Sequence, residues 1–409
     1  MLSTLIYRSR LNPDVDSGEI NQIVLSAQRN NEVISVTGIL LFDGDYFFQI
    51  LEGPYTEVNA LFRKICLDRR HNTIVELMRD YAPLRRFGNL GMELFDLRHF
   101  RQEFVLEAVL AKGTSKYNLT YDDRAFKFIR TFVEGRWRDH TQEISEAPCW
   151  QFIPESTPFR TVTDAPLRHQ PCEFALQPIV EPLQYRISSL EALIRSPGGG
   201  SPAHYFSSLT KDKIYEADLQ SKAYALSLAK KIGLGNHMIS INLLPMSLVM
   251  VPGAVEILLE QITRNGLVPE QVIVEVTEDE VISRFDEFET AIRQLRSAGI
   301  SLAIDDFGSG FAGLSLLSRF QPEKIKIDRQ IITDVHKNGV RQAIVQAIVK
   351  CCSSLEISVV AEGVEKPEEW CWLEAAGIRH FQGYLFARPA LNGVSPIAWP
   401  RKKITMKMR

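Results

Sequence analysis

The second half of the chain places acidic side chains directly after short apolar runs. Asp305 and Asp306 end the run LAIDD, and Glu275 lies within VIVEVT. Other polar residues recur in similar positions: Glu191, Asn242, Glu278, Lys326, Asp328, Glu362 and Glu365. Carboxylates that face one another repel and raise one another's pKa values unless a cation neutralises them. Because oxygen ligands with one amide suit Mg²⁺ or Mn²⁺, the pattern predicts a site for hard divalent cations.

A second interpretation competes for the same stretch. Residues 308–313 read GSGFAG, which is the G-x-G-x-x-G pattern of dinucleotide-binding loops, and Asp328 has the spacing of a ribose-binding acid. A pyrophosphate placed behind Asp305 and Asp306 would meet two negative charges, whereas such loops deliver it to bare amides at a helix N-terminus. We therefore favour the metal site, with a dehydrogenase as the remaining alternative.

The elements that must position these acids are predicted to be barrel strands. From residue 172 onward the strand candidates are FALQPIV, SSLEALI, MISINLL, VIVEVTE, SLAIDDF, KIKID, SVVAEGVE and FQGYLFA. Eight strands with helices between them favour a (β/α)8 barrel of the TIM type, in which the strand ends meet at one mouth. Only EPLQYRI separates the first two strands, which is too short for a crossover helix. A modified barrel with an antiparallel first pair is therefore expected. Any single acid could still be a solvated strand end or a helix cap.

The first hundred residues predict a different, α+β domain. Strand-like and helix-like segments alternate as β-α-β-β-α-β-β, and the dipeptide DG at 43–44 marks a hairpin. This order suggests a ferredoxin-like sandwich with helices on one face of a mixed sheet. Residues 101–140 look helical, and residues 145–171 contain five prolines, a composition that marks a linker. We expect domains at 1–100 and 172–400, joined by a connector at 101–171.

The composition sets limits on partners and compartment. A formal net charge of -3 gives no global basic field for DNA, RNA or an anionic membrane. The six cysteines lack paired C-x-x-C spacing, which favours reduced thiols. About 18 consecutive apolar residues, as a membrane span needs, appear nowhere. The expectation is a cytoplasmic protein.

Seven segments of the second half resemble, in order and spacing, the EAL domain, the phosphodiesterase of cyclic di-GMP. They are EALIR, SINLLP, VEVTE, IDDFGSG, KIKIDR, AEGVE and FQGYLFARP, within residues 172–400. The resemblance implies two divalent cations, Mg²⁺ or Mn²⁺, with Asp305 as a bridging ligand. The implied metal ligands are Glu191, Asn242, Glu275, Asp305, Asp306 and Glu362. Two metals can activate water and steady the leaving oxygen of an in-line displacement at phosphorus.

The same resemblance implies further roles. The expected catalytic residues are Lys326, Glu362 and Glu191, with Lys326 orienting or deprotonating the attacking water at a pKa lowered by the cations. The expected substrate-binding residues are Gln177, Arg195 and Gln382, and the residues expected to support the metal ligands are Glu278, Asp328 and Glu365. Ala312 and Gly313 stand where many family members carry hydroxyls, which bears on how the loop after Asp306 is anchored.

The front domain resembles the BLUF domain, a blue-light sensor that binds FAD noncovalently. In DYFFQILEG, the alternation of side chains along a strand places Gln49 among apolar neighbours. A buried amide needs hydrogen-bond partners, and neighbouring backbone groups could supply them without any ligand. The segments that carry the resemblance are LIYRSR, RNNEVISVTGILLF, FFQILEG, DRRHNTIVEL and RRFGNLGMELF, within residues 2–98. It implies that Tyr7 and Gln49 rearrange their hydrogen bonds after excitation. The other implied flavin-site residues are Asn31, Arg70, His71 and Met92. Leu90 stands where some members have a tryptophan.

Together the two resemblances predict a blue-light-activated phosphodiesterase that hydrolyses cyclic di-GMP to linear pGpG. A homodimer is expected, since EAL domains commonly dimerise. The rival prediction is a light sensor whose EAL domain is catalytically weak and controls a protein partner. A degenerate domain usually loses a metal ligand, whereas every ligand of the set is present here.

Overall fold

The chain folds into two compact units. The computed structural model describes residues 2–15, 20–82, 85–87, 92–112, 124–135, 137–138, 147–162, 170–207, 209–210, 213–277, 284–310, 313–319 and 321–403. Met1–Ser145 and Asp334–Ala343 form the first unit, and Glu146–Thr333 and Ile344–Arg409 form the second. Each unit has its own sheet and its own core.

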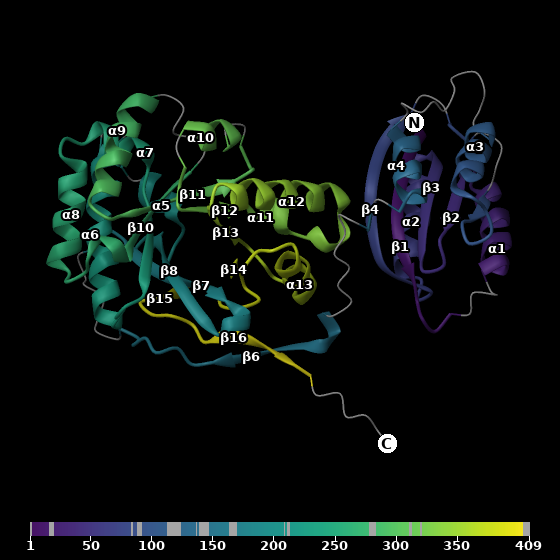
Figure 1. The fold of residues 1–409 in the computed structure, drawn as a ribbon. Helices are drawn as coiled ribbons and strands as arrows, with labels where there is room; N and C mark the ends of the chain where they lie inside the picture. Colours follow the sequence, from purple (N-terminus) through teal and green to yellow (C-terminus); the bar gives the residue numbers. More distant parts are fainter. Residues whose placement is uncertain are drawn as a thin grey trace. The chain divides into compact units, whose positions relative to one another are not determined.

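The first unit contains a five-stranded mixed sheet in the order β4-β1-β3-β2-β5 (Figure 1). Its elements are β1 (Leu2–Leu11), α1 (Ile20–Val33), β2 (Thr37–Phe42), β3 (Tyr46–Pro54), α2 (Tyr55–Leu67), β4 (His71–Ala82) and β5 (Glu93–Asp96). The strand pair β2–β5 is parallel, and the others are antiparallel. In the hairpin between β2 and β3, the Asp43 carboxylate accepts the N–H groups of Asp45 and Tyr46. The order β-α-β-β-α-β-β and the ferredoxin-like topology are confirmed.

Helices cover both faces of this sheet. On one face, Leu5 and Leu51 pack with Val24 of α1 and Val58 of α2. On the other, alternate strand residues such as Phe48 pack against two helices that follow the sheet in sequence, α3 (Gln102–Lys112) and α4 (Arg124–Val133). The two helices within residues 1–100, α1 and α2, share one face as expected, and the helices on the other face come from the segment after residue 100. The segment predicted to connect the domains supplies the second helical layer of the first unit.

The second unit is a closed eight-strand barrel with one extra short strand. Its sheet runs β14-β13-β12-β11-β10-β9-β8-β7-β15, and β14 also pairs with β7, which closes the ring. The strands are β7 (Glu173–Glu181), β8 (Arg186–Arg195), β9 (Met238–Asn242), β10 (Val272–Thr277), β11 (Ser301–Phe307), β12 (Lys324–Ile327), β13 (Ser358–Ala361), β14 (His380–Phe381) and β15 (Ala390–Leu391). The predicted antiparallel pair β7–β8 is confirmed, and the strands from β8 to β14 are parallel.

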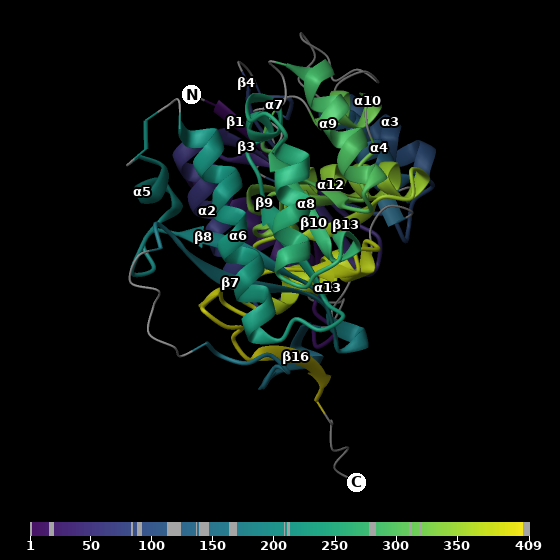
Figure 2. The same ribbon diagram turned by 90° about the vertical axis from the view of Figure 1, so that its left-hand side faces the viewer.

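Helices surround the barrel (Figures 1 and 2). They are α5 (Pro202–Ser207), α6 (Ile214–Ile232), α7 (Pro245–Met250), α8 (Ala254–Arg264), α9 (Phe285–Ser297), α10 (Gly313–Arg319), α11 (Arg329–Ile332), α12 (Gly339–Ser354) and α13 (Pro367–Ala375). Figure 2 shows α6 and α8 side by side on the outside of the strands. Among the described helices, none combines the length and the apolar character that crossing a membrane requires. All six cysteines are free thiols, as expected.

Two strand predictions need correction. The segment FQGYLFA is a strand only at its first residue, because β14 ends at Phe381 and the backbone then turns at Gly383, which has φ +156°. The proline-rich segment contains an unpredicted strand, β6 (Trp150–Glu155), which pairs antiparallel with β16 (Ile397–Lys402). Its partner lies more than two hundred residues later in the chain, so local sequence carried no sign of the pairing.

Candidate active site and flavin pocket

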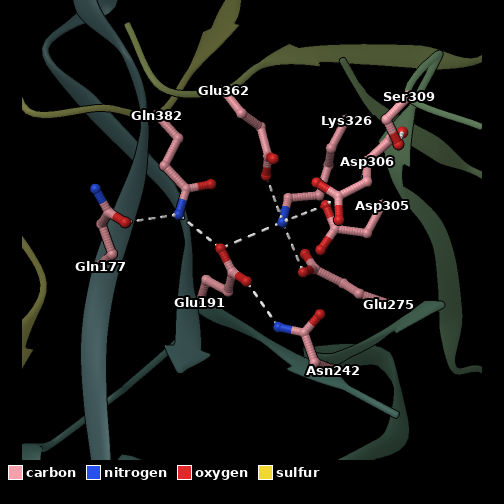
Figure 3. Close-up of polar contacts among 10 residues, drawn as sticks. All are labelled: Gln177, Glu191, Asn242, Glu275, Asp305, Asp306, Ser309, Lys326, Glu362 and Gln382. Carbon is pink, nitrogen blue, oxygen red and sulfur yellow. Dashed lines mark hydrogen bonds and ion pairs between the residues drawn. The ribbon is translucent and has the colours of Figure 1, made fainter. Parts of the chain in front are cut away.

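The barrel brings the predicted acids together at one mouth (Figure 3). Strand register does this directly: Glu275 of β10 lies opposite Asn242 of β9, and Thr277 of β10 lies opposite Asp305 of β11. Glu191 comes from β8, and Glu362 follows β13 at once. Because adjacent parallel strands end at the same level, residues 51 to 191 positions apart meet through their side chains.

Lys326 lies at the centre of the cluster. Its side chain is 1% exposed, and its Nζ lies 3.2 Å from Glu191 Oε2, 2.8 Å from Glu275 Oε2, 3.1 Å from Asp305 Oδ1 and 2.6 Å from Glu362 Oε1. Figure 3 shows these four carboxylates converging on the one ammonium group. A single buried cation therefore holds four acids whose mutual repulsion would otherwise be severe.

Three amides fix the position of Glu191. Asn242 Nδ2 donates to Glu191 Oε1 at 2.7 Å, and Gln382 Nε2 donates to Glu191 Oε2 at 2.6 Å. The same Gln382 nitrogen lies 3.2 Å from Gln177 Oε1, and Gln177 Nε2 donates to the carbonyl of Ala387. Gln382 Oε1 is buried and has no hydrogen-bond partner among the described residues. It is therefore an acceptor available to a ligand at the mouth.

The DDFG turn places two carboxylates next to each other, with Asp305 buried and Asp306 partly exposed. Asp306 has φ +53°, a left-handed conformation that is costly for a residue other than glycine, and its N–H donates to Asp305 Oδ1 at 3.0 Å. Ser309 Oγ donates to the Asp306 carbonyl and holds the turn. Glu191, Glu275 and Asp305 bring ligand atoms within 4.8 Å of one another, and Asp305, Asp306 and Glu362 do the same. Asp305 belongs to both groups, which suits a residue between two cation positions.

The protonation chemistry follows from burial. Burial raises the pKa of Glu275 to about 8, opposed by Lys326 and reinforced by Glu191 and Asp305. Burial likewise raises the pKa of Asp306 to about 6 and that of Glu362 well above its usual range. Burial would also raise the pKa of Glu191, but Lys326 and the amides around it hold that pKa below its usual value.

Lys326 itself differs from expectation. Burial lowers the pKa of a lysine, but Asp305, Glu191, Glu275 and Glu362 outweigh it and raise the pKa of Lys326 well above its usual range. The predicted lowering presupposes two cations beside the ammonium, whereas the protein groups alone act in the opposite direction. The four carboxylates thus make Lys326 a firmly protonated hydrogen-bond donor.

A cavity of about 220 Å³ opens beside the cluster. Its walls include Gln177, Glu191, Asp305, Asp306, Asp328, Glu362, Glu365 and Gln382 from the predicted set, together with Arg329, Gly363, Gly383 and Tyr384. Arg329 and Tyr384 were missed, although each follows a predicted residue closely within the motifs KIKIDR and FQGYLFARP.

The remaining predicted residues have distinct positions. Asp328 caps α11 by accepting the Gln330 N–H at 2.7 Å. Glu365 Oε1 lies 3.4 Å from Arg329 Nη2. Arg195 is not part of the cavity wall; its guanidinium donates to the carbonyl of Ile194 at 2.8 Å. The predictions for Glu278 and Ala312, and for the side-chain setting of Gly313, fall outside the described residues.

The first unit has its own cavity, of about 230 Å³. It is lined by all six residues predicted to contact flavin, Tyr7, Asn31, Gln49, Arg70, His71 and Met92, and by apolar residues of α1 and α2. Lys64 and Asp68 also line it and were missed. Lys64 lies three residues after Leu61 on α2, a spacing that places both on one helix face, and Asp68 is the C-cap residue that follows the helix.

Three side chains that line this cavity are joined by hydrogen bonds. Tyr7 and Gln49 are paired across β1 and β3, and the Tyr7 hydroxyl donates to Gln49 Oε1. Gln49 Nε2 then donates to Met92 Sδ at 3.0 Å. Burial raises the pKa of Tyr7 far above its ordinary value, with Cys66 and Asp68 adding to it, so the phenol keeps its proton. A change at Gln49 would therefore reach both Tyr7 and the residue that precedes β5.

Polar groups line one end of the same cavity. Arg70 binds Asp68 through both of its carboxylate oxygens, and His71 Nδ1 lies 3.0 Å from Ser9 Oγ. Burial lowers the pKa of His71, which favours the neutral ring. The cavity thus has an apolar part that also contains the Asn31 and Gln49 amides, and a polar end that contains Asp68, Arg70 and His71.

Comparison with known proteins identifies the family of each unit. A family model for the EAL domain matches residues 160–389, and a model described as sensors of blue-light using FAD (BLUF) matches residues 2–93. The chain belongs to the EAL family and carries an N-terminal BLUF domain. This BLUF–EAL protein is 55% identical to the "Blue light- and temperature-regulated antirepressor BluF" of Escherichia coli (strain K12), over 98% of this chain and 100% of that one.

Other relatives carry phosphodiesterase names or ligands. The structure of Klebsiella pneumoniae BlrP1 in a manganese and cyclic di-GMP complex matches the BLUF–EAL protein with a TM-score of 0.91 and 48% identity, covering 98% and 100% of the two chains. "Cyclic di-GMP phosphodiesterase PdeR" of Escherichia coli (strain K12) is 40% identical over 28% of this chain and 18% of its own. The BLUF–EAL protein is thus related to cyclic di-GMP phosphodiesterases.

Proposed function

We propose that this protein is a blue-light-activated phosphodiesterase that hydrolyses cyclic di-GMP to linear pGpG. The observation that carries the proposal is the acid cluster, in which Asp305 is shared by two groups of potential cation ligands around Lys326. A barrel mouth lined with carboxylates, amides and one cationic arginine can hold two metals and an anionic substrate together. The manganese and cyclic di-GMP complex of BlrP1, a relative over the whole chain, supports the same assignment.

The donor set fits hard divalent cations such as Mg²⁺ or Mn²⁺. Glu191, Asn242, Glu275, Asp305, Asp306 and Glu362 supply carboxylate and amide oxygens within a small volume. Two cations held there would supply the Lewis-acid chemistry of phosphodiester hydrolysis and a water acidic enough to attack phosphorus.

The chain's own groups then divide the remaining work. Lys326 Nζ lies among the carboxylates proposed to hold the cations, so we assign it to orienting the attacking water. Glu362 and Glu191 contact that ammonium and can pass a proton to or from the same position. Gln177 and Gln382 form an amide pair beside Glu191 that can bind the substrate. Arg329 at the cavity wall is better placed than Arg195 to meet a phosphate.

The sensor proposal rests on the first cavity. Its apolar walls and the Tyr7–Gln49–Met92 chain suit a planar flavin ring, and Arg70 and His71 suit the polar tail. We infer FAD, as the matched family description states, although one BlrP1 structure contains FMN. We also propose a homodimer, which light scattering on the purified protein would test.

A second candidate function has a specific observation behind it. The relative that is 55% identical over nearly the whole chain is named an antirepressor, so this EAL domain could control a protein partner instead of hydrolysing nucleotide. The complete ligand set favours the enzyme, since a docking role has no need of six convergent metal ligands.

The test is cyclic di-GMP turnover by the purified flavoprotein with Mg²⁺ or Mn²⁺, in darkness and under blue light. We expect linear pGpG to form in both states and faster in light. Glu275→Gln should lower the rate about 100-fold or more, as loss of a ligand to a catalytic metal does. Glu181→Gln is the matched control, because Glu181 is also a buried barrel carboxylate but contacts Arg186 and His380 instead of Lys326. No product in either state, with flavin and metal bound, would leave the antirepressor function.

A further inference from the structure

A buried ion pair lies on α6, behind the loop that follows Asn242. Asp218 and Lys222 are one helical turn apart, each is 2% exposed, and Lys222 Nζ lies 2.5 Å from Asp218 Oδ1. Taking two charges out of water costs free energy that their attraction often fails to recover. A pair of this kind therefore calls for an explanation other than stability.

The second oxygen of Asp218 reaches the next helix. Asp218 Oδ2 accepts the N–H of Leu244 at 2.9 Å and the hydroxyl of Ser247 at 2.8 Å. Leu244 is the N-cap of α7 and cannot cap the helix with its own side chain, and Pro245 follows it. Asp218 thus accepts, from another helix, the N–H of the N-cap residue, which is the bond that the N3 glutamate of a capping box makes.

The capped residue is two positions from the cation cluster. Leu243, between Asn242 and Leu244, donates its N–H to the Glu275 carbonyl at 2.9 Å. The link from Asn242 to α7 is therefore fixed on one side by β10 and on the other by Asp218. Asn242 Nδ2 donates to Glu191, so Asn242 Oδ1 faces away from the Glu191 carboxylate. A small rotation of the backbone between Asn242 and α7 would turn Oδ1 away from the acid cluster.

We propose that Asp218, oriented by its ion pair with Lys222, is a positioning residue for the cation site. It fixes the backbone link at Leu243 and Leu244 and so sets the direction of the Asn242 amide oxygen. This inference rests on the proposed function in taking the cluster as a cation site, and it adds a residue on the outer layer of the barrel to the set that controls cation affinity.

The experiment measures Mn²⁺ binding by electron paramagnetic resonance on the purified full chain. Asp218→Asn should weaken Mn²⁺ binding by about tenfold or more, and Ser247→Ala by several-fold, as lost support for a ligand does. Ser221→Ala is the matched control, since Ser221 contacts Lys222 and the Asp218 carbonyl but no residue of the loop. We expect it to bind as the wild type does. In turnover assays the Mn²⁺ concentration for half-maximal rate should rise while the rate at saturating Mn²⁺ stays within about twofold.

Each outcome decides between positioning and mere stability. Wild-type Mn²⁺ affinity in folded Ser247→Ala and Asp218→Asn would overturn the inference, and so would an equal loss in Ser221→Ala. Ser247→Ala leaves the ion pair intact and keeps the test valid if Asp218→Asn does not fold. If the wild type binds Mn²⁺ but does not hydrolyse cyclic di-GMP, the proposed function fails while the affinity comparison still decides this point. A wild type that binds no Mn²⁺ would overturn both.

Discussion

At the residue scale, we predict that light sensing requires the Tyr7 hydroxyl. Tyr7 donates to Gln49 Oε1, and Gln49 donates to Met92 Sδ. Tyr7→Phe should keep flavin bound but remove the light-induced change in its absorbance spectrum, because the phenol can no longer exchange partners with Gln49. Tyr46→Phe is the matched control: Tyr46 lies on β3 but packs on Trp137 in the core of the opposite face. An intact light response in Tyr7→Phe would show that the hydrogen bonds among Tyr7, Gln49 and Met92 play no part in light sensing.

The acid cluster predicts a pH dependence of cation binding. The pKa of Asp306 is about 6 and that of Glu275 about 8, so both carboxyls hold protons at low pH and lose them as the pH rises. A cation must displace those protons, and also the proton of Glu362, whose pKa burial raises well above its usual range, so its affinity increases with pH. We expect Mn²⁺ affinity to rise at least about tenfold per pH unit between roughly pH 6 and 8. Isothermal titration calorimetry across this range checks it, and a flat profile would contradict it.

The sequence predicted the members of the cation site because they share one simple property. Glu191, Glu275, Asp305 and Glu362 all stand at or beside the ends of apolar strands, and a barrel brings such ends together. It could not show that Lys326 contacts all four, since that depends on distances between strands that are not neighbours. The position of Arg195 in a motif likewise did not show that its guanidinium donates to the backbone carbonyl of Ile194, and its role in substrate binding stays a prediction.

At the element scale, α4 should be essential to the first unit. Phe126 is fully buried on α4 against the outer face of the sheet. Phe126→Ala should lower the free energy of unfolding of that unit by about 3 to 5 kcal/mol, through lost burial and the cavity left behind. Phe104→Ala on α3 is the control; Phe104 is 55% exposed, and its loss should cost less than about 0.5 kcal/mol.

The measurement for both variants is thermal unfolding of the full chain followed by flavin fluorescence. Equal stability of Phe126→Ala and the wild type would show that α4 is a tether and not part of the sensor fold. The sequence predicted that α3 and α4 are helices but not which surface they pack against, because an apolar helix face can pack against any apolar surface. Both faces of β1 and β3 carry apolar side chains, so the sheet needs a helical layer on each face.

At the scale of the whole molecule, the proposed function predicts a coupling between light and substrate binding. If the lit state binds cyclic di-GMP more tightly, bound cyclic di-GMP stabilises the lit state by the same factor. We expect saturating cyclic di-GMP, with EDTA present to prevent turnover, to slow the return of the flavin spectrum to its dark form. GMP is the control ligand. An unchanged recovery rate would place light control on the turnover step instead of substrate binding.

The shortest strand of the barrel also has a bearing on assembly. β14 has two residues, and its contact with β7 is the single pair Phe381–Val180. Gln382 comes next and joins Gln177 of β7 to Glu191 of β8. The hydrogen bonds that organise the mouth therefore bridge the seam where the ring closes, and a chain whose ring is open lacks an organised mouth. Closure of the barrel and completion of the site are the same event.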